Sequence, residues 1–259
     1  MRIATWNVNS LKARMDRVEE WIGYAEPDVL CMQETKMTDK AFPAMAFSAM
    51  GYDSVHHGEG RWNGVAILSR VGIDDVVSGF AAGIEPDRDA RLLTATCGGI
   101  RVMTVYVPNG REVGHEHYHY KLDWMRRLRE HLDAAATPTD EVLVCGDFNI
   151  APDDRDVWDP AACNGGTHVS EPERAALARV VDWGLEDVFR RQYQADRLYT
   201  WWDYRAGMFH KHMGMRIDLM YASASLADRL DWTLIDRNAR KGVQPSDHAP
   251  LVGSFQERL

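Results

Sequence analysis

Long apolar runs are missing from this 259-residue sequence. None approaches the ~20 residues that a helix needs to cross a bilayer. The first ten residues, MRIATWNVNS, have neither the apolar segment nor the small-residue cleavage site of a signal peptide. We therefore expect a cytoplasmic protein without a membrane partner.

Paired cysteines and positive charge are also scarce. The four cysteines show no CxxC spacing, and Cys31, Cys97 and Cys145 lie in apolar, strand-like runs. Buried free thiols are therefore expected rather than disulfides or zinc ligands. The net charge of -9 argues against a non-specific polyanion binder. It does not exclude nucleic acid, because the local distribution of charge matters more than the total.

One apolar run ends in a polar pair. Residues 142–145 (VLVC) are typical of a buried strand, and Gly146 permits a sharp bend after it. Asp147 and Asn149 are two residues apart and so share one face at the carboxyl end of this strand. Open α/β folds bind ligands at such ends. An ordinary Asp/Asn turn would explain the pair equally well in isolation.

Strands and helices are expected in both halves of the chain, with several hairpins and no linker or repeat. Helices are predicted over residues 12–24, 116–135 and 173–183, and Ser170 and Glu173 have the spacing of a capping box. Residues 153–173 are expected to form a long loop. Strands are predicted over residues 2–8, 28–32, 51–57, 63–69, 92–97, 100–107, 216–222 and 232–236, with a final strand after His248.

Basic side chains are frequent on the predicted helix over residues 116–135. Lys121, Arg126, Arg127 and Arg129 accompany an apolar stripe there. We interpret these four as a solvated face rather than a binding surface.

Polar residues recur at the predicted strand ends, and nearly all of them carry oxygen. They are Asn7, Glu34, Tyr106, Asp147, Asn149, Asp218, Asp247 and His248. Carboxylates and amides suit Mg²⁺ or Mn²⁺ better than zinc. A cation, a group that activates water and donors to the phosphate oxygens are what phosphoryl transfer requires.

These segments resemble a known family. TWNVNS, QETK, YVPNGR, GDFNIAP, WWDYR, GMRID and PSDHAP occur in this order and are similar to exonuclease III, a family of bacterial DNA-repair nucleases and AP endonucleases. The resemblance covers nearly the whole chain. It implies an α/β fold with deoxyribonuclease-I-like architecture: a four-layer sandwich in which two mixed β-sheets pack face to face between helices. Residues 1–259 would form one domain.

The resemblance also implies roles for the catalytic residues. Glu34 would be the main metal ligand with Asn7 beside it, and Asp247 would lie near a possible second metal position. Asp147 would orient or deprotonate the attacking water, and Asn149 would hold that water or the phosphate. The remaining implied catalytic groups are an Asp218–His248 pair with His248 facing the phosphate, and Tyr106 at the phosphate or leaving oxygen.

Substrate contacts are implied as well. Trp201, Met215 and Ile217 would line the pocket for a flipped, base-less sugar. Asn109 and Arg216 would contact phosphate, and Arg88, Arg91 and Lys211 are further candidates. Two positions depart from the animal branch of the family: Asn9 replaces an acidic residue, and Met215 replaces a larger aromatic one. The second change predicts a more permissive sugar pocket.

The expected activity is therefore that of a Mg²⁺-dependent DNA-repair phosphodiesterase, with Mn²⁺ as a substitute. It would cleave double-stranded DNA 5′ to abasic sites and remove nucleotides or blocking groups from 3′ ends, as a monomer. Two alternatives stay open. One is a protein of the same fold that acts on another phosphate ester, and the other is a catalytically inactive relative that binds RNA.

Overall fold

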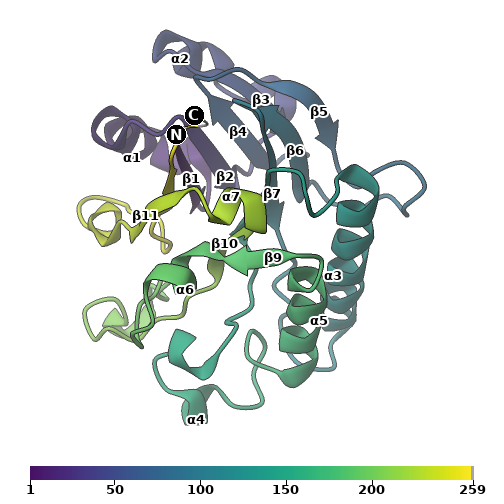
Figure 1. Ribbon diagram of the computed structural model, residues 1–259. Helices are drawn as coiled ribbons and strands as arrows, with labels where there is room; N and C mark the ends of the chain where they lie inside the picture. Colours follow the sequence, from purple (N-terminus) through teal and green to yellow (C-terminus); the bar gives the residue numbers. More distant parts are fainter. Residues whose placement is uncertain (258–259) are drawn as a thin grey trace.

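Two six-stranded β-sheets form the centre of the computed structural model, which describes residues 1–257 (Figure 1). In spatial order, the first sheet contains β11 (Leu230–Ile235), β12 (Leu251–Phe255), β1 (Arg2–Asn7), β2 (Val29–Gln33), β4 (Val65–Ser69) and β3 (Asp53–His57). The second contains β5 (Asp74–Ser78), β6 (Leu92–Cys97), β7 (Ile100–Tyr106), β8 (Val142–Asp147), β10 (Asp218–Ser223) and β9 (Leu185–Asp187). Both sheets are mixed, because β1–β2 and β7–β8 are parallel and the other pairs are antiparallel.

The two sheets bury their inner faces against each other. Along β8, Leu143 and Cys145 point between the sheets, whereas Val142 and Val144 point to the outer face of the second sheet. This alternation is the two-residue period of a strand. Because both faces are covered, β8 is apolar at nearly every position and is buried along its whole length. Cys31, Cys97 and Cys145 are buried free thiols, as predicted.

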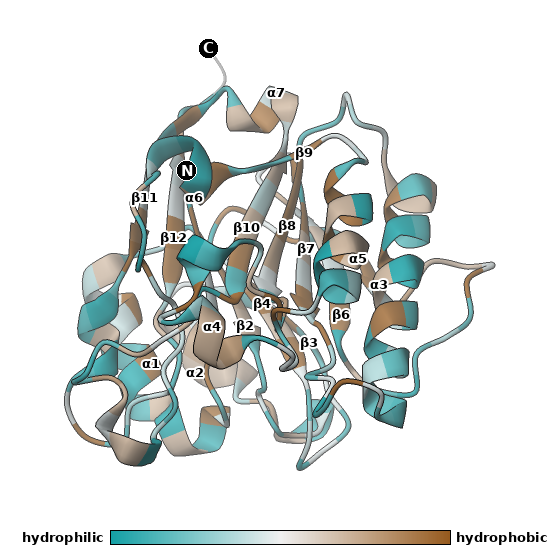
Figure 2. Ribbon diagram, turned by 90° about the horizontal axis from the view of Figure 1, so that it is seen from below, coloured by the Kyte–Doolittle hydropathy of each residue, from teal (hydrophilic) through white to brown (hydrophobic). Residues whose placement is uncertain are grey.

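Seven α-helices lie around the sheets within residues 1–257. They are α1 (Leu11–Ala25), α2 (Ala44–Ala49), α3 (Glu116–Ala135), α4 (Pro160–Cys163), α5 (Glu171–Val181), α6 (Val188–Gln192) and α7 (Ala224–Ala227). Apolar side chains of α1 and α2 pack on the first sheet, and those of α3 and α5 pack on the second. Figure 2 shows these two helix pairs on opposite sides of the sheets. The predicted four-layer α/β sandwich is confirmed.

Several boundaries and short elements differ from the sequence predictions. The expected loop over residues 153–173 contains α4 and the first three residues of α5, which begins at Glu171 and not at 173. Its capping box of Ser170 and Glu173 is confirmed. Sequence periodicity missed β5, β9, α2, α6 and α7, because segments of three to six residues are too short to show a period.

The first and last strands lie side by side, so both ends of the described chain meet at one edge of the fold. The Phe255 amide donates to the Met1 carbonyl at 2.8 Å, and β1 pairs with β12. Figure 1 places the two ends next to each other. Among residues 1–257, no helix combines the length and the apolar character that a bilayer crossing requires.

Candidate active site

The strands bring four of the predicted polar positions to one edge of the sandwich. Asn7 ends β1 opposite Gln33 of the parallel strand β2, and Glu34 follows directly. In the other sheet, Asp147 ends β8 and is paired with the first residue of β10, Asp218. The carboxyl ends of parallel strands lie at the same edge of a sheet, and this geometry assembles the site.

Asn7 joins the two central carboxylates. Its Nδ2 donates to Glu34 Oε1 and to Asp147 Oδ2, both at 2.8 Å, across the gap between the sheets. Its Oδ1 accepts from the Asn9 backbone amide at 3.0 Å, which fixes the orientation of the side-chain amide. The sequence predicted a metal ligand at Asn7. In the structure the Asn7 amide holds the two carboxylates together, and its role toward a metal stays a prediction.

His248 is held between two aspartates. Its Nδ1 donates to Asp218 Oδ2 at 2.8 Å, and its Nε2 lies 3.9 Å from Asp147 Oδ2. Burial lowers the pKa of His248, but the carboxylates of Asp218 and Asp247 outweigh this effect and raise it to about 10. The imidazole is therefore protonated at neutral pH. Burial has the opposite effect on the carboxyl group, because it raises the pKa of Asp147.

The donor set fits a hard divalent cation. One ligand atom from each of Glu34, Asp147 and His248 lies within 4.8 Å of the others. A protonated imidazole is not a ligand, so the two carboxylates are the metal-binding candidates. Lys36 Nζ lies 2.8 Å from Glu34 Oε2 and offsets part of the negative charge. Two carboxylates drawn together in a largely buried site favour a bound cation, because like charges at close range destabilise each other.

Asn149 and Asn109 bring two amide side chains to the site. The Asn149 backbone amide donates to Asp147 Oδ1 at 2.9 Å, and its Nδ2 donates to the Val107 carbonyl at 2.9 Å. Asn109 donates to Asn149 Oδ1 at 3.2 Å. Asn149 and Glu34 both adopt left-handed backbone conformations, with φ of 50° and 53°. Such conformations are uncommon for residues other than glycine and are often found at functional sites.

Tyr106 completes this side as a neutral donor. Burial raises its pKa, and the nearby Glu34 carboxylate raises it further. The hydroxyl therefore keeps its proton at neutral pH. The Arg91 guanidinium lies 4.7 Å from the centre of the Tyr106 ring, beside the site.

Lys121 is a site residue that the sequence reasoning missed. Its side chain is fully buried, and Nζ donates to the Asn149 carbonyl at 2.6 Å, the Asn109 carbonyl at 3.2 Å and the Glu173 carboxylate. Lys121 therefore holds the backbone carbonyls of Asn149 and Asn109 in place. The predicted solvated face was wrong here and at Arg127, which is also buried, although Arg126 is exposed.

His168 was also missed. This residue of the α4–α5 connection has a half-buried side chain, and its Nδ1 hydrogen-bonds to the Asn149 carbonyl. Burial lowers the pKa of His168 to about 4, and the Lys121 charge acts in the same direction. A neutral imidazole thus contacts the backbone of Asn149. The polar, aperiodic segment around it carried no signal that could have identified it.

The predicted sugar-pocket residues lie together. Trp201, Met215 and Ile217 belong to one apolar cluster with Val157. Trp201 and Met215 are partly exposed beside the site, and the Trp201 ring centre is 6.4 Å from that of His248. The Trp201 indole donates to Asp247 Oδ2 at 3.0 Å, and the other oxygen of Asp247 accepts from Asn9. Asp247 thus links the pocket wall to the β1 end of the site.

Arg216 was predicted to contact phosphate, and its burial argues against this role. Its side chain is fully buried and forms ion pairs with Asp156 and Asp187. A guanidinium enclosed in this way is not exposed to a phosphate, so Arg216 stabilises the fold rather than contacting DNA. Trp202, the neighbour of Trp201 in the chain, is fully buried as well.

The geometry agrees with comparisons to known proteins. The model of the Endonuclease/Exonuclease/phosphatase family matches residues 4–248. The chain belongs to this family. The match runs from β1 to His248 and so includes every predicted catalytic and metal-site residue.

Several known proteins resemble the chain over nearly its whole length. Exodeoxyribonuclease III of Haemophilus influenzae is 32% identical, with 99% of this chain and all of that protein covered. A solved structure of an AP endonuclease from Archaeoglobus fulgidus has a TM-score of 0.96 and 37% identity, covering 99% of this chain and 100% of that one. The 3′ phosphatase NExo from Neisseria, solved with a product DNA hairpin, has a TM-score of 0.94 and 37% identity over the same shares.

Proposed function

We propose that this protein is a metal-dependent DNA-repair phosphodiesterase that acts at DNA 3′ ends and at abasic sites. The observation that carries the proposal is the position of Asp147, which lies between the Asn7–Glu34 pair and the Asp218–His248 pair. The names of the related proteins, exodeoxyribonuclease III, AP endonuclease and 3′ phosphatase, support DNA as the substrate.

Each catalytic group has a role that its surroundings allow. Asp147 orients the attacking water and accepts its proton. His248, kept protonated by Asp218, donates to a non-bridging phosphate oxygen and stabilises the charge that develops there. The Asn149 and Asn109 amides and the Tyr106 hydroxyl lie on the other side of Asp147, where they hold the water, the phosphate or the leaving oxygen.

Glu34 and Asp147 would hold the metal, and Mg²⁺ is the cation that we propose, with Mn²⁺ as a substitute. Bound there, it would neutralise phosphate charge and polarise the phosphorus–oxygen bond. Asn7 keeps the two carboxylates in position for it. We propose that the principal metal position lies at Glu34 and Asp147, with Asp247 near a possible second position.

Trp201, Met215 and Ile217 would receive the sugar. An apolar pocket beside His248 suits a sugar without a base, because extrusion costs least where no base is stacked. Cleavage 5′ to such a site would leave a 3′ hydroxyl and a 5′ deoxyribose phosphate. We further propose that residues 1–259 act as one domain and as a monomer in the cytoplasm.

The test uses a duplex with one labelled end and a single abasic analogue, incubated with the protein in Mg²⁺ and separately in EDTA. A metal-dependent cut 5′ to the lesion is expected, with laddering from the 3′ end. A matched duplex with a 3′ phosphate measures how fast the protein removes a blocking group from a 3′ end. A duplex that is bound but uncut in Mg²⁺ and in Mn²⁺ would support an inactive, nucleic-acid-binding relative. Neither cutting nor binding would favour another phosphate ester.

A further inference from the structure

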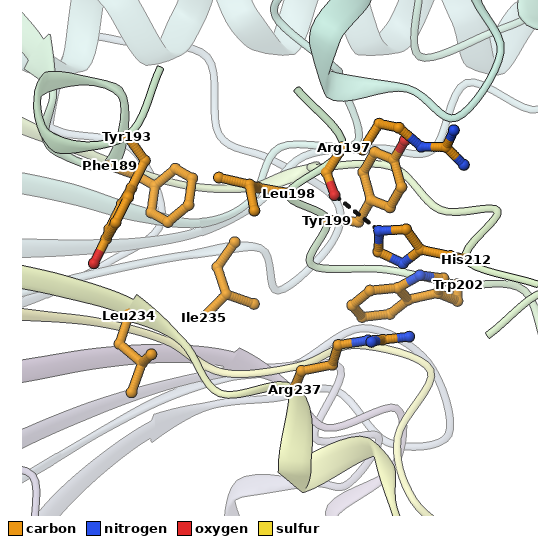
Figure 3. Close-up of a pocket in the computed structure, with 10 residues that line it drawn as sticks. All are labelled: Phe189, Tyr193, Arg197, Leu198, Tyr199, Trp202, His212, Leu234, Ile235 and Arg237. Carbon is orange, nitrogen blue, oxygen red and sulfur yellow. Dashed lines mark hydrogen bonds between the residues drawn. The ribbon is translucent and has the colours of Figure 1, made fainter. Parts of the chain in front are cut away.

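A second pocket lies away from the catalytic groups. Its volume is about 370 Å³, and it is bounded by α6, the segment that follows it, and β11 (Figure 3). None of the residues predicted for the active site lines it. This size is at the lower end of the range for small-molecule sites.

A single segment, residues 199–202, separates this pocket from the active site. Trp201 faces the catalytic side, where its indole donates to Asp247. Trp202 faces the other way and lines the pocket together with Tyr199. Trp201 and Trp202 are adjacent in the chain, so this segment borders both sites.

One end of the pocket is apolar and open. Figure 3 shows Phe189 and Tyr193 across from Leu234, with Leu198 and Ile235 between them. Leu234 is 49% exposed and Tyr193 is 38% exposed. These side chains form a slot in which a planar apolar group would lose its contact with water.

The other end carries positive charge. Arg197 and Arg237 lie at the side that holds His212 and Trp202 (Figure 3). Arg237 packs over Phe209, 4.7 Å from the ring centre, and His212 Nε2 donates to the Arg197 carbonyl at 3.0 Å. Within residues 1–257, neither guanidinium is ion-paired with a carboxylate, although most arginines of this acidic chain are. An anionic ligand would supply the missing partner.

We propose that this pocket binds a nucleoside 5′-monophosphate, with the base in the apolar slot and the phosphate at the end of the pocket that carries Arg197 and Arg237. Aromatic walls next to guanidinium groups are the combination that takes a base and its phosphate. The choice of this ligand rests on the proposed function: removal of a 3′-terminal nucleotide with a 3′ hydroxyl left on the DNA releases a nucleoside 5′-monophosphate. The shared segment 199–202 then connects product binding to Trp201 in the active site.

Binding is measured by calorimetry of the full chain with dAMP in EDTA, which removes the metal on which phosphate binding at the catalytic centre depends. Arg197→Gln should weaken binding about tenfold or more, as expected for loss of a charge-assisted hydrogen bond. Leu234→Asp, at an exposed position, should weaken it similarly by placing a carboxylate at the mouth. Arg191→Gln on α6 is the matched control, because Arg191 pairs with Glu186 and Asp228 outside the pocket. It should bind like the wild type.

Three outcomes would overturn the proposal. They are an absence of dAMP binding, equal binding by the Arg197→Gln and Arg191→Gln variants, and loss of binding in Asn149→Ala, which would place the nucleotide in the active site. Deoxyadenosine alone and inorganic phosphate alone should each bind more weakly than dAMP, and equal binding of phosphate would exclude a role for the apolar slot. The assay needs no cleavage, so it is independent of the duplex assay that tests the proposed function.

Discussion

Lys121 donates a hydrogen bond to the backbone of Asn149, with its Nζ 2.6 Å from the Asn149 carbonyl oxygen. The ammonium group also pairs with Glu173, and both side chains are fully buried. A helix residue that sequence periodicity assigns to solvent therefore fixes the backbone of a catalytic amide.

Replacing Lys121 with Met should lower both stability and turnover. The change leaves the Glu173 carboxylate buried without its cation, which should cost about 3 to 5 kcal/mol in the free energy of unfolding. Displacement of Asn149 should lower kcat by about 100-fold. Urea denaturation and single-turnover kinetics measure the two effects. The double variant Lys121→Met/Glu173→Gln should regain part of the stability but little of the activity. Full recovery of activity would show that Lys121 acts only through stability.

Asp147→Asn and His248→Asn should each reduce hydrolysis far more than DNA binding. Each variant removes a group that acts on the water or on the developing phosphate charge, so a loss of about 100- to 10,000-fold in kcat is expected. Rates are measured on the abasic duplex, and affinity is measured by anisotropy of the same duplex in EDTA. His119→Asn, an exposed position on α3, is the control. Near-normal turnover in either variant would refute the role assigned to that residue.

His131 should make the protein sensitive to acid. This residue of α3 is 1% exposed, and its Nδ1 accepts from the Ala81 amide at 3.0 Å. Burial, with a smaller effect of Arg101, lowers the pKa of His131 to about 4 in the folded state. The unfolded chain takes up the proton near pH 6.5, so stability is fully present above that pH and is lost as pH falls toward 4. Protonation of His131 should lower the free energy of unfolding by up to about 3 kcal/mol.

The measurement is the urea midpoint at pH 7 and at pH 4.5. His131→Gln removes the titrating group and should show a smaller difference between the two midpoints than the wild type does. His119→Gln, which is exposed, should keep the wild-type difference. An unchanged difference in His131→Gln would assign the acid sensitivity to other groups.

Met215→Trp should narrow the sugar pocket. Met215 is partly exposed and packs near Trp201, so a larger ring at this position reduces the space for an undamaged nucleotide. The exonuclease rate on undamaged ends should fall relative to abasic cleavage. The comparison uses matched duplexes, with Met45→Trp at an 88% exposed position as the control. An unchanged ratio of the two rates would refute the idea.

The positions at strand ends were predictable from sequence because local rules determine them. An apolar run indicates where a buried strand ends, and parallel strands bring such ends together. Asn7, Glu34 and Asp147 were therefore identified before any contact was known. The predictions that were wrong concern residues whose partners are distant in the sequence. Lys121 pairs with Glu173, 52 positions away, and Arg216 pairs with Asp156, 60 positions away.

Asn7 shows which detail of a site the sequence leaves open. Residue type indicates that an amide belongs at the site, but the direction of its oxygen is set by the Asn9 amide. His168 shows a different limit, because its segment has neither periodicity nor a polar strand end. Only the folded chain places it against the Asn149 carbonyl.

The adjacency of the first and last strands has a consequence for the order in which the protein is made. Asn7 belongs to the first strand, whereas His248 precedes the last one, and Ser246 donates to the Asn7 carbonyl at 2.7 Å. A polypeptide released shortly before residue 248 therefore lacks the histidine although it contains Asn7 and Asp147. Such a fragment lacks the imidazole that we assign to the developing phosphate charge, so we expect it not to hydrolyse DNA.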